Sequence, residues 1–305
     1  MSRPGPIQAP SRRAGTSRPR LRAGRPSWRG SRPDDLRPLA GLTIRPPPPI
    51  FPRRCTAGGS IVFSLEGRRA FVTGASGLLG GHFARVLHGA GAEVVLAARR
   101  IEACEALAAE LGSRASAVRL DVQDEASIAA ALDGPVCDIL VNNAGIAATR
   151  PFLEQTAEDW DQVVDVNLRG AFFVAQAAAK RMAAARSGGS IINIASILGL
   201  RVISGVAGYT SAKAGLIQLT RQMAVELARH SIRVNAIAPG YVASDLNAEF
   251  FASEGGQAMI RRIPQRRLGR PEDLDGALLL LASAAGAHMT GSVITVDGGH
   301  SINPI

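Results

Sequence analysis

The feature that most constrains the fold of this chain is a series of short, continuously apolar runs separated by stretches of helical composition. A strand with one solvent-exposed face would alternate apolar and polar residues. Continuous apolar runs are instead typical of a parallel sheet that helices cover on both sides. Strands and helices alternating over about 240 residues predict a doubly wound α/β domain. The runs lie at residues 69–74, 93–98, 138–142, 190–195, 233–238 and 292–296, and a seventh strand is expected before Asp121.

Local signals mark where some helices begin and end. Residues 101–111 are helical by composition, and Gly112 follows them as a C-cap glycine. Thr156 and Asp159 form a capping-box-like pattern, which predicts the start of a long helix that extends to Met182.

Residues 1–60 differ in composition from the rest of the chain. They hold 12 of the 18 prolines and 13 arginines against two aspartates, a formal charge of +11 that leaves −1 for residues 61–305. We expect a disordered Arg/Pro-rich N-terminal extension, followed by one folded domain at 61–305. The extension could be dispensable or a start-site artefact, a targeting leader, or an arm that binds RNA phosphates. The prolines disfavour a leader helix, and Trp28 offers little base stacking, so nucleic acid binding is not favoured.

Cysteine usage and hydropathy exclude two classes of protein. Cys55, Cys104 and Cys137 are an odd number without CxxC spacing, which argues against a disulfide framework or a zinc site and fits a reducing, cytoplasmic environment. No apolar run approaches the roughly 20 residues of a membrane span, so a membrane protein is not expected.

A glycine-rich turn follows the first predicted strand directly. Gly74, Gly77 and Gly80 lie between this strand and a helix, where the backbone must turn tightly and can approach a pyrophosphate. The helix that follows offers free N–H groups and the positive end of its dipole to an anion. This turn, with Ser76 and Leu79, predicts a dinucleotide phosphate site.

The ends of the next strands add to this site. Arg99 follows the second strand, where an NAD site would place an acidic residue, and a guanidinium can pair with a 2′-phosphate. The sequence therefore favours NADP(H), with NAD(H) possible if the arginine is only a solvated surface residue. Asp121 and Val122 could contact the adenine, and the run Asn142–Gly145 could line the cofactor channel.

Tyr209 and Lys213 are four residues apart in a helical stretch, so the phenol and the ammonium share one face. A nearby cation stabilises phenolate and would bring its pKa from about 10 towards working pH. Lys213 and Lys180 are the only lysines among 35 basic residues, so a lysine at this position indicates a requirement for a compact ammonium.

Two further polar residues could complete this chemistry. Ser196 follows the fifth predicted strand (residues 190–195), at the sheet edge where ligands bind, although a serine there can also cap a helix. Asn167 lies inside the predicted long helix, where an amide indicates a kink, a bound water or a tolerated polar residue.

Together these motifs resemble the short-chain dehydrogenase/reductase family over about residues 61–305. The resemblance rests on seven elements in order: the turn at 74–80, Asn142–Gly145, Asn167, Ser196, Tyr209 with Lys213, Pro239–Gly240, and Val296–Gly299. It implies a Rossmann fold with a seven-stranded parallel sheet that transfers hydride directly between nicotinamide C4 and a carbonyl or alcohol carbon, without a metal.

The resemblance also implies a role for each residue. Tyr209 would act as the general acid or base, Lys213 would lower its pKa and hold the ribose, Ser196 would polarise the carbonyl, and Asn167 would hold a relay water. The residues expected to bind the cofactor are Gly74, Ser76, Gly77, Leu79, Gly80, Arg99, Asp121, Val122, Asn143, Ala144, Gly145, Tyr209, Lys213, Pro239, Gly240 and Val242.

One position departs from the family pattern. The short, single-domain branch usually has glycine where this chain has Leu78, and the glycine at 77 resembles the extended branch. The Asn-Asn-Ala-Gly run, the four intact catalytic residues and the short C-terminal remainder favour the single-domain branch.

Within the family, residues 240–271 resemble gluconate 5-dehydrogenases and 3-oxoacyl-carrier-protein reductases. The substrate would then be a small keto sugar acid or ketone, with a 3-oxoacyl group as the alternative; a non-catalytic dinucleotide-binding regulator with an RNA-binding tail is the alternative of another class. Residues 241–267 would form a substrate lid, in which Phe250, Phe251 and Met259 contact the pocket or simply pack against the domain. A homodimer or homotetramer is expected, through residues 277–285 and the helix that holds Asn167.

Overall fold

The computed structural model describes residues 62–244 and 247–303, so the extension expected at 1–60 lies outside the described residues. The described part contains one seven-stranded sheet in the order β3-β2-β1-β4-β5-β6-β7, in which every pair of neighbours is parallel. This confirms the predicted fold class. The strands are β1 (Arg69–Thr73), β2 (Glu93–Ala98), β3 (Ala115–Arg119), β4 (Ile139–Asn142), β5 (Gly189–Ile194), β6 (Ile232–Pro239) and β7 (Val293–Val296).

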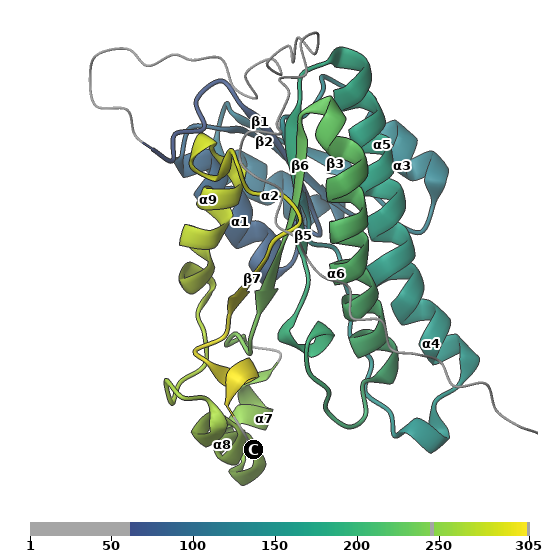
Figure 1. Ribbon diagram of the computed structural model, residues 1–305, viewed down its shortest axis with the longest axis vertical. Coiled ribbons are helices and arrows are strands. Elements are labelled where there is room, and N and C mark those ends of the chain that lie inside the picture. The colour runs from purple at the N-terminus through teal and green to yellow at the C-terminus, as the bar shows by residue number, and fades with distance from the viewer. Residues whose placement is uncertain (1–61, 245–246, 304–305) are drawn as a thin grey trace, which may run out of the picture. The chain divides into compact units, whose positions relative to one another are not determined.

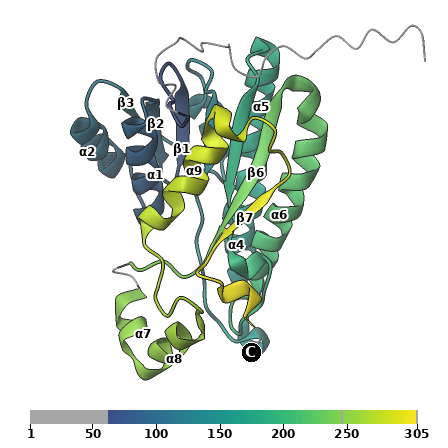
Figure 2. The ribbon, with the colours of Figure 1, turned by 60° about the vertical axis from the view of Figure 1, so that its left-hand side comes forward.

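Helices cover both faces of the sheet (Figures 1 and 2). One face carries α1 (Leu78–Gly89), α2 (Ile101–Leu111) and α9 (Asp275–Ala282), and the other carries the helices between β3 and β6. These are α3 (Glu125–Ala131), α4 (Ala157–Val164), α5 (Ala171–Ala185) and α6 (Ala207–Leu227). The short helices α7 (Ala248–Ala252) and α8 (Glu254–Arg262) follow β6. None of the helices in the described ranges is long and apolar enough to cross a membrane.

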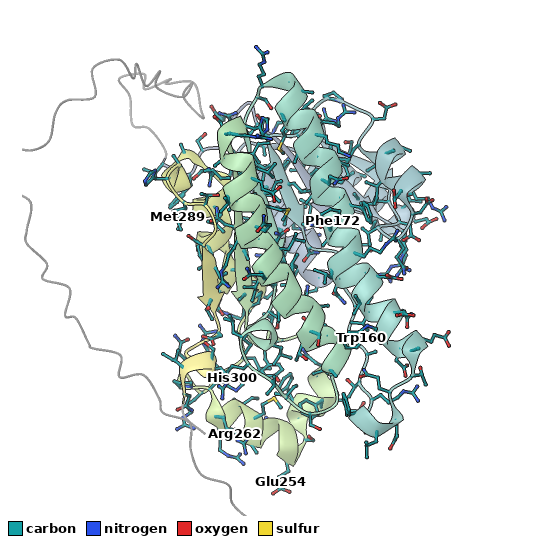
Figure 3. All side chains as sticks on the ribbon, turned by 45° about the vertical axis from the view of Figure 1, so that its right-hand side comes forward. Trp160, Phe172, Glu254, Arg262, Met289 and His300 are labelled. Carbon is teal, nitrogen blue, oxygen red and sulfur yellow. The ribbon has the colours of Figure 1, made fainter. Side chains whose placement is uncertain are left out.

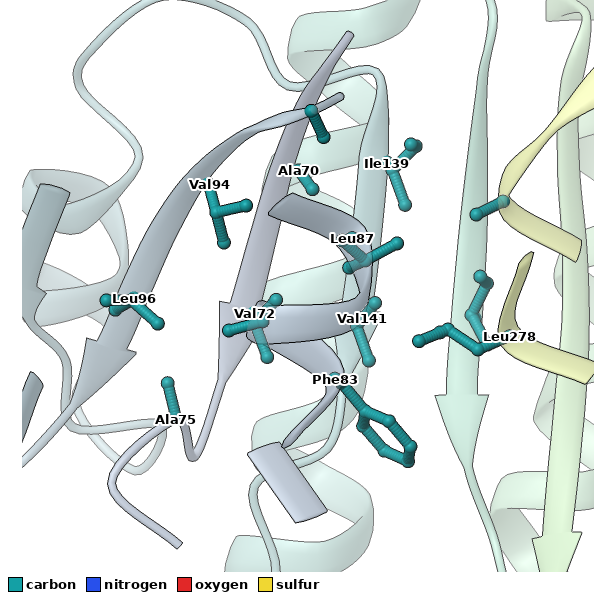
Figure 4. Packing of buried hydrophobic residues seen from close by; sticks show 14 of the residues in the cluster. Ala70, Val72, Ala75, Phe83, Leu87, Val94, Leu96, Ile139, Val141 and Leu278 are labelled. Carbon is teal, nitrogen blue, oxygen red and sulfur yellow. The ribbon is translucent and has the colours of Figure 1, made fainter. Parts of the chain in front are cut away.

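The two faces of the strands pack into two separate cores because successive side chains of a strand point to opposite sides. In β1, Val72 packs with Leu87 and Leu96 under α1 and α2, and the adjacent Phe71 packs with Leu140 on the other face. Figure 4 shows the first of these cores. Each large apolar side chain buried here contributes roughly 1.5–3 kcal/mol to folding, so the position of every strand end is firmly held.

The helix ends show how local sequence sets these elements. Gly112 ends α2 with a positive φ of 84°, which suits glycine. At the start of α4, Thr156 accepts from the backbone N–H of Asp159, and the Asp159 carboxylate accepts from the N–H of Thr156, so the predicted capping box is confirmed. The long helix expected from this point is interrupted by a π-helical turn at Asp165–Gly170 before α5 begins.

The strand order places a ligand crevice at one edge of the sheet. From β1 the chain moves outward through β2 to β3, and it then returns to β4 on the other side of β1. Connections that leave neighbouring strands in opposite directions open a crevice at the carboxyl ends of those strands. The glycine turn after β1 and the loop after β4 meet there.

Candidate active site

A cavity of about 820 Å³ lies at the carboxyl edge of the sheet. It is formed by the residues that follow β1 to β6, together with the start of α1 and one face of α6. Every residue predicted above to bind the cofactor or to carry the chemistry lines it, but Asn142, which was expected in the cofactor channel, does not. The lining residues not predicted from the sequence are Ala98, Arg100, Leu120, Ile146, Ala147, Val166, Ile194 and Ala195.

The glycine turn needs its glycines for two reasons. Gly74 has a φ of +66°, and a Cβ there would lie 2.9 Å from the Cα of Ala144. A Cβ at Gly80 would collide with the carbonyl oxygen of Gly74 and lie 2.7 Å from Asn143 Nδ2. Thr73 Oγ1 accepts from the backbone N–H groups of Asn143 and Ala144, both at 2.9 Å. The turn and the loop after β4 are thereby fixed against each other.

The N-terminus of α1 is free to bind an anion. Its N-cap, Gly77, makes no side-chain capping hydrogen bond, and no acidic residue lies in the first turn. The first N–H groups and the positive dipole end are therefore left for a ligand. Leu78, where the family pattern has glycine, is 51% exposed and does not line the cavity. The displaced glycine thus leaves the cavity wall unaltered.

Two arginines stand at the end of β2. Arg99 and Arg100 are exposed and line the cavity, and Arg100 donates to the backbone oxygen of Ser76, 3.3 Å away. Asp121, after β3, uses one carboxylate oxygen to accept from the backbone N–H of Gln123. The cavity therefore carries positive charge at the end of β2, with no carboxylate directly after that strand.

The two asparagines after β4 have different surroundings. Asn142 is buried and donates to the oxygens of Ala171 and Asn193, so it ties β4 to the neighbouring elements. Asn143 lines the cavity and donates to the carbonyl oxygen of Thr73 at 2.9 Å. The polar character of this run therefore serves the packing of the sheet as well as the cavity.

Asn167 occupies the π-helical turn and is fully buried. Its Nδ2 donates to the backbone oxygens of Ile146 (2.7 Å) and Val163 (2.9 Å), and its Oδ1 accepts from the N–H of Ile146. Val163 lies four residues earlier, so the amide replaces the backbone donor that a regular helix would supply. Both hydrogens on Nδ2 are used, so a further partner of Asn167 would have to donate to its side-chain Oδ1 or to its backbone oxygen.

Ser196, Tyr209 and Lys213 lie together on the cavity wall. Ser196 Oγ accepts from the N–H of Leu198 at 3.1 Å, so it caps a short 3₁₀ helix, and it also hydrogen bonds with the Tyr209 hydroxyl. Lys213 Nζ lies 5.7 Å from the centroid of the Tyr209 ring and donates to the backbone oxygen of Ile194 at 2.8 Å. One ammonium hydrogen is thus engaged and two remain.

Burial dominates the ionisation of this group. It raises the pKa of Tyr209, and the hydrogen bond with Ser196 only partly opposes that rise. Burial also lowers the pKa of the Lys213 ammonium to about 8, and that ammonium donates a hydrogen bond to Ile194. In this state of the protein the phenol holds its proton.

The segment after β6 forms α7 and α8, and the three residues suggested as lid contacts do not line the cavity. Phe250 is 49% exposed, and the buried Phe251 packs edge-to-face on Tyr241 with ring centroids 5.6 Å apart. Of the three, Phe251 packs against the domain. Within the described ranges, no group of three or more His, Cys, Asp or Glu side chains is placed to hold a metal ion.

Known proteins share this arrangement. The family described as Enoyl-(Acyl carrier protein) reductase matches residues 74–301. The chain is 42% identical over 245 residues to the 2-dehydro-3-deoxy-D-gluconate 5-dehydrogenase of Escherichia coli K12, a match that covers 78% of this chain and 96% of the relative.

Two solved structures have the same fold over the same region. A short-chain type dehydrogenase/reductase from Mycobacterium marinum is 40% identical, with a TM-score of 0.74 over 78% of this chain and 97% of that one. A gluconate 5-dehydrogenase from Burkholderia cenocepacia, in complex with NADP and tartrate, is 36% identical, with a TM-score of 0.76 over 79% and 98%. The chain therefore belongs to the short-chain dehydrogenase/reductase family of oxidoreductases, in its short single-domain branch.

Proposed function

We propose that this protein transfers a hydride between NADP(H) and the carbonyl or secondary alcohol carbon of a small keto sugar acid. The observation that carries the proposal is the composition of one cavity. Ser196, Tyr209 and Lys213 line the same space as the glycine turn after β1 and Arg99 after β2. A dinucleotide that lies along this cavity would reach from a phosphate site to a proton donor.

The cavity fits NADP in its size and in its donors. The uncapped N-terminus of α1 suits the pyrophosphate, and the glycine turn that precedes it lines the cavity. Arg99 and Arg100 suit a 2′-phosphate, since guanidinium groups pair with phosphate oxygens in two-point bonds. NADP is bound in the gluconate 5-dehydrogenase relative. When bound, the nicotinamide ring would supply or accept the hydride.

Tyr209 is suited to act as a general acid. A phenol whose pKa is raised by burial stays protonated at neutral pH, and it can give its proton to a carbonyl oxygen as that oxygen gains charge. The hydrogen bond from Ser196 stabilises the phenolate that remains. The apo arrangement therefore favours carbonyl reduction, and alcohol oxidation requires that Tyr209 first lose its proton.

Lys213 and Asn167 support this proton transfer. The two ammonium hydrogens of Lys213 that Ile194 does not take are available for ribose hydroxyls and for the phenolate. Asn167 holds the π-helical turn and the backbone of Ile146, so its part is to position the cavity wall; a relay water would have to bind one of its oxygens. Hydride transfer by this arrangement needs no metal ion.

The substrate class rests on the relatives. Two of those described above act, by name, on gluconate or a deoxy keto-gluconate, and one of them holds tartrate, a small hydroxy acid. A 3-oxoacyl thioester is the competing substrate, because a 3-oxoacyl-[acyl-carrier-protein] reductase of Rickettsia bellii is 38% identical to this chain over 240 residues.

The test is oxidation of NADPH, followed at its absorbance, against a panel of keto-gluconates, 3-oxoacyl thioesters and simple diketones, and repeated with NADH. We expect the highest kcat/KM for a keto-gluconate with NADPH. Tyr209→Phe should lose about 10²–10⁴-fold of this activity and keep NADPH binding. Lys180→Met, at the exposed second lysine, is the control that should change neither. Absence of turnover with every carbonyl would refute the proposal.

We also propose a homodimer or homotetramer that uses α9 and α5 as contact faces. α5 is rich in alanine and α9 in leucine, and parts of both faces are only half-buried. Light scattering on the purified protein measures the oligomer mass.

A further inference from the structure

Tyr241 and His300 carry two polar atoms that the chemistry above leaves unused. Within residues 62–244 and 247–303, Tyr241 Oη and His300 Nδ1 are buried and lack a hydrogen-bond partner. The two rings contact each other, with centroids 5.5 Å apart and planes tilted by 40°. Folded proteins almost always give buried polar atoms a partner, because an unpaired one destabilises the fold. Two such atoms in one contact therefore indicate a missing ligand group.

Arg201 brings a positive charge to the same place. Its guanidinium donates to the backbone oxygen of His300, and no other hydrogen bond or ion pair joins it to the described residues. Burial raises the pKa of the Tyr241 phenol, and the charge of Arg201 opposes that shift. Burial lowers the pKa of His300, and Arg201 lowers it further. Arg201 thus adds positive charge around Tyr241 and His300, which the Asp297 carboxylate partly offsets at His300, and its guanidinium keeps N–H donors that no described residue accepts.

This cluster adjoins the proposed active site. Tyr241 lies between Gly240 and Val242, which line the cavity, and it raises the pKa of Tyr209, although less than burial does. The three residues of the cluster come from distant parts of the chain: the loop before α6, the end of β6, and the C-terminal 3₁₀ helix. Figure 3 shows the last of these beside α8. Its closeness to α8 also appears in a hydrogen bond from Asn303 Nδ2 to the backbone oxygen of Arg262.

We propose that Arg201, Tyr241 and His300 form the subsite for the carboxylate of the substrate, at the end of the molecule away from the reacting carbon. A carboxylate is an acceptor for several donors, and a guanidinium, a phenol and an imidazole N–H supply them. A neutral hydroxyl would leave the guanidinium unsatisfied. Because Tyr241 Oη is covered, the carboxylate enters with a shift of the Tyr241 ring or of the Phe251 ring that packs on it. This inference rests on the proposed function, whose substrate is an acid.

The first test compares tartrate with threitol, which has the same carbon chain with CH₂OH in place of each carboxylate. Calorimetric titration with NADP present should give wild-type protein an affinity for tartrate at least about tenfold above that for threitol. Arg201→Gln should lose this preference. Arg261→Gln, at an exposed arginine of α8, is the matched charge control and should keep it. Equal affinities in the wild type, or an unchanged preference in Arg201→Gln, would overturn the subsite.

The second test separates ligand binding from fold stability. Tyr241→Phe removes an unpaired buried hydroxyl, so the melting temperature should stay the same or rise, while the affinity for tartrate should fall about tenfold. Unchanged tartrate affinity would overturn the role of Tyr241 and would leave a buried water as the partner of its hydroxyl. Neither binding test needs turnover. Failure of the subsite is therefore distinguishable from failure of the proposed function, which would leave NADPH unoxidised with every carbonyl.

Discussion

Replacing Lys213 with methionine should stabilise the protein while it abolishes the proposed activity. Lys213 is 4% exposed, and burial alone lowers the pKa of its ammonium from 10.5 to about 8. At neutral pH the folded protein therefore holds a charge that the unfolded chain solvates far better. Methionine has a similar length and no charge, so it removes this penalty.

The size of the effect follows from the pKa. A lowering of about 2.5 units, at about 1.4 kcal/mol each, means that the buried charge costs roughly 3 kcal/mol at pH 7. Loss of the hydrogen bond to Ile194 destabilises the variant by about 1 kcal/mol. The net gain is about 2 kcal/mol, which for a domain of this size corresponds to a rise of about 4–8 °C in melting temperature.

The stability gained by Lys213→Met should depend on pH. Between pH 8 and 10.5 the unfolded chain still binds the proton that the folded protein has released, so the stability of the wild type rises with pH in that window. The advantage of Lys213→Met should therefore be full below pH 8 and nearly absent by about pH 10. Urea unfolding of the cofactor-free protein at pH 7 and pH 9.5 measures it, with Lys180→Met as the exposed control. A variant less stable than wild type at pH 7, or an advantage that does not shrink at pH 9.5, would refute the reasoning.

Three further predictions concern residues in the cavity wall and beside it. Arg99→Asp should raise the KM for NADPH about tenfold or more and lower the KM for NADH, because it removes a partner for the 2′-phosphate and supplies one for the ribose hydroxyls. Initial rates with both cofactors measure this change, and an unchanged ratio of the two KM values would count against a 2′-phosphate site there. Gly145→Ala would put a Cβ 2.5 Å from Asn167 Oδ1 and 3.5 Å from Lys213 Nζ, so kcat should fall about 100-fold while the circular dichroism spectrum stays unchanged. Near-normal turnover would show that the close approach of Gly145 to Asn167 is not needed. Leu78→Gly should leave the NADPH dissociation constant within about twofold in a fluorescence titration, since Leu78 is exposed and does not line the cavity; a large gain in affinity would mean that it obstructs the phosphate site.

The strands could be predicted because a strand buried on both faces has a continuous run of apolar residues in its sequence. Each residue of β4, β5 and β6 is buried, and each strand is therefore a continuous apolar run broken only by residues that serve the site or the sheet. β3 is an edge strand with half-exposed residues, so its sequence has no such run, and only the position of Asp121 indicated where it ends. The π-helical turn could not be predicted, since Asn167 signals an irregularity without specifying which kind.

The candidate site could be located from the ends of strands, where the polar residues stand. Chemical details that depend on contacts between distant segments could not. Spacing alone put Lys213 near Tyr209, but it could not reveal that Ile194 takes one ammonium hydrogen and that burial raises the pKa of Tyr209. The pairing of Tyr241 with His300 likewise joins the end of β6 to the C-terminus, and nothing local in either segment signals it.

The central claim is that the Tyr209 phenol delivers a proton as hydride reaches a carbonyl carbon. The most direct measurement is a single turnover of a keto-gluconate with excess enzyme and NADPH, followed by loss of NADPH absorbance, for wild type and Tyr209→Phe, with NADPH binding measured in parallel by fluorescence. The account predicts rapid oxidation by the wild type and a rate about 10²–10⁴-fold lower in Tyr209→Phe, with equal NADPH affinity. Oxidation by Tyr209→Phe at the wild-type rate would contradict it.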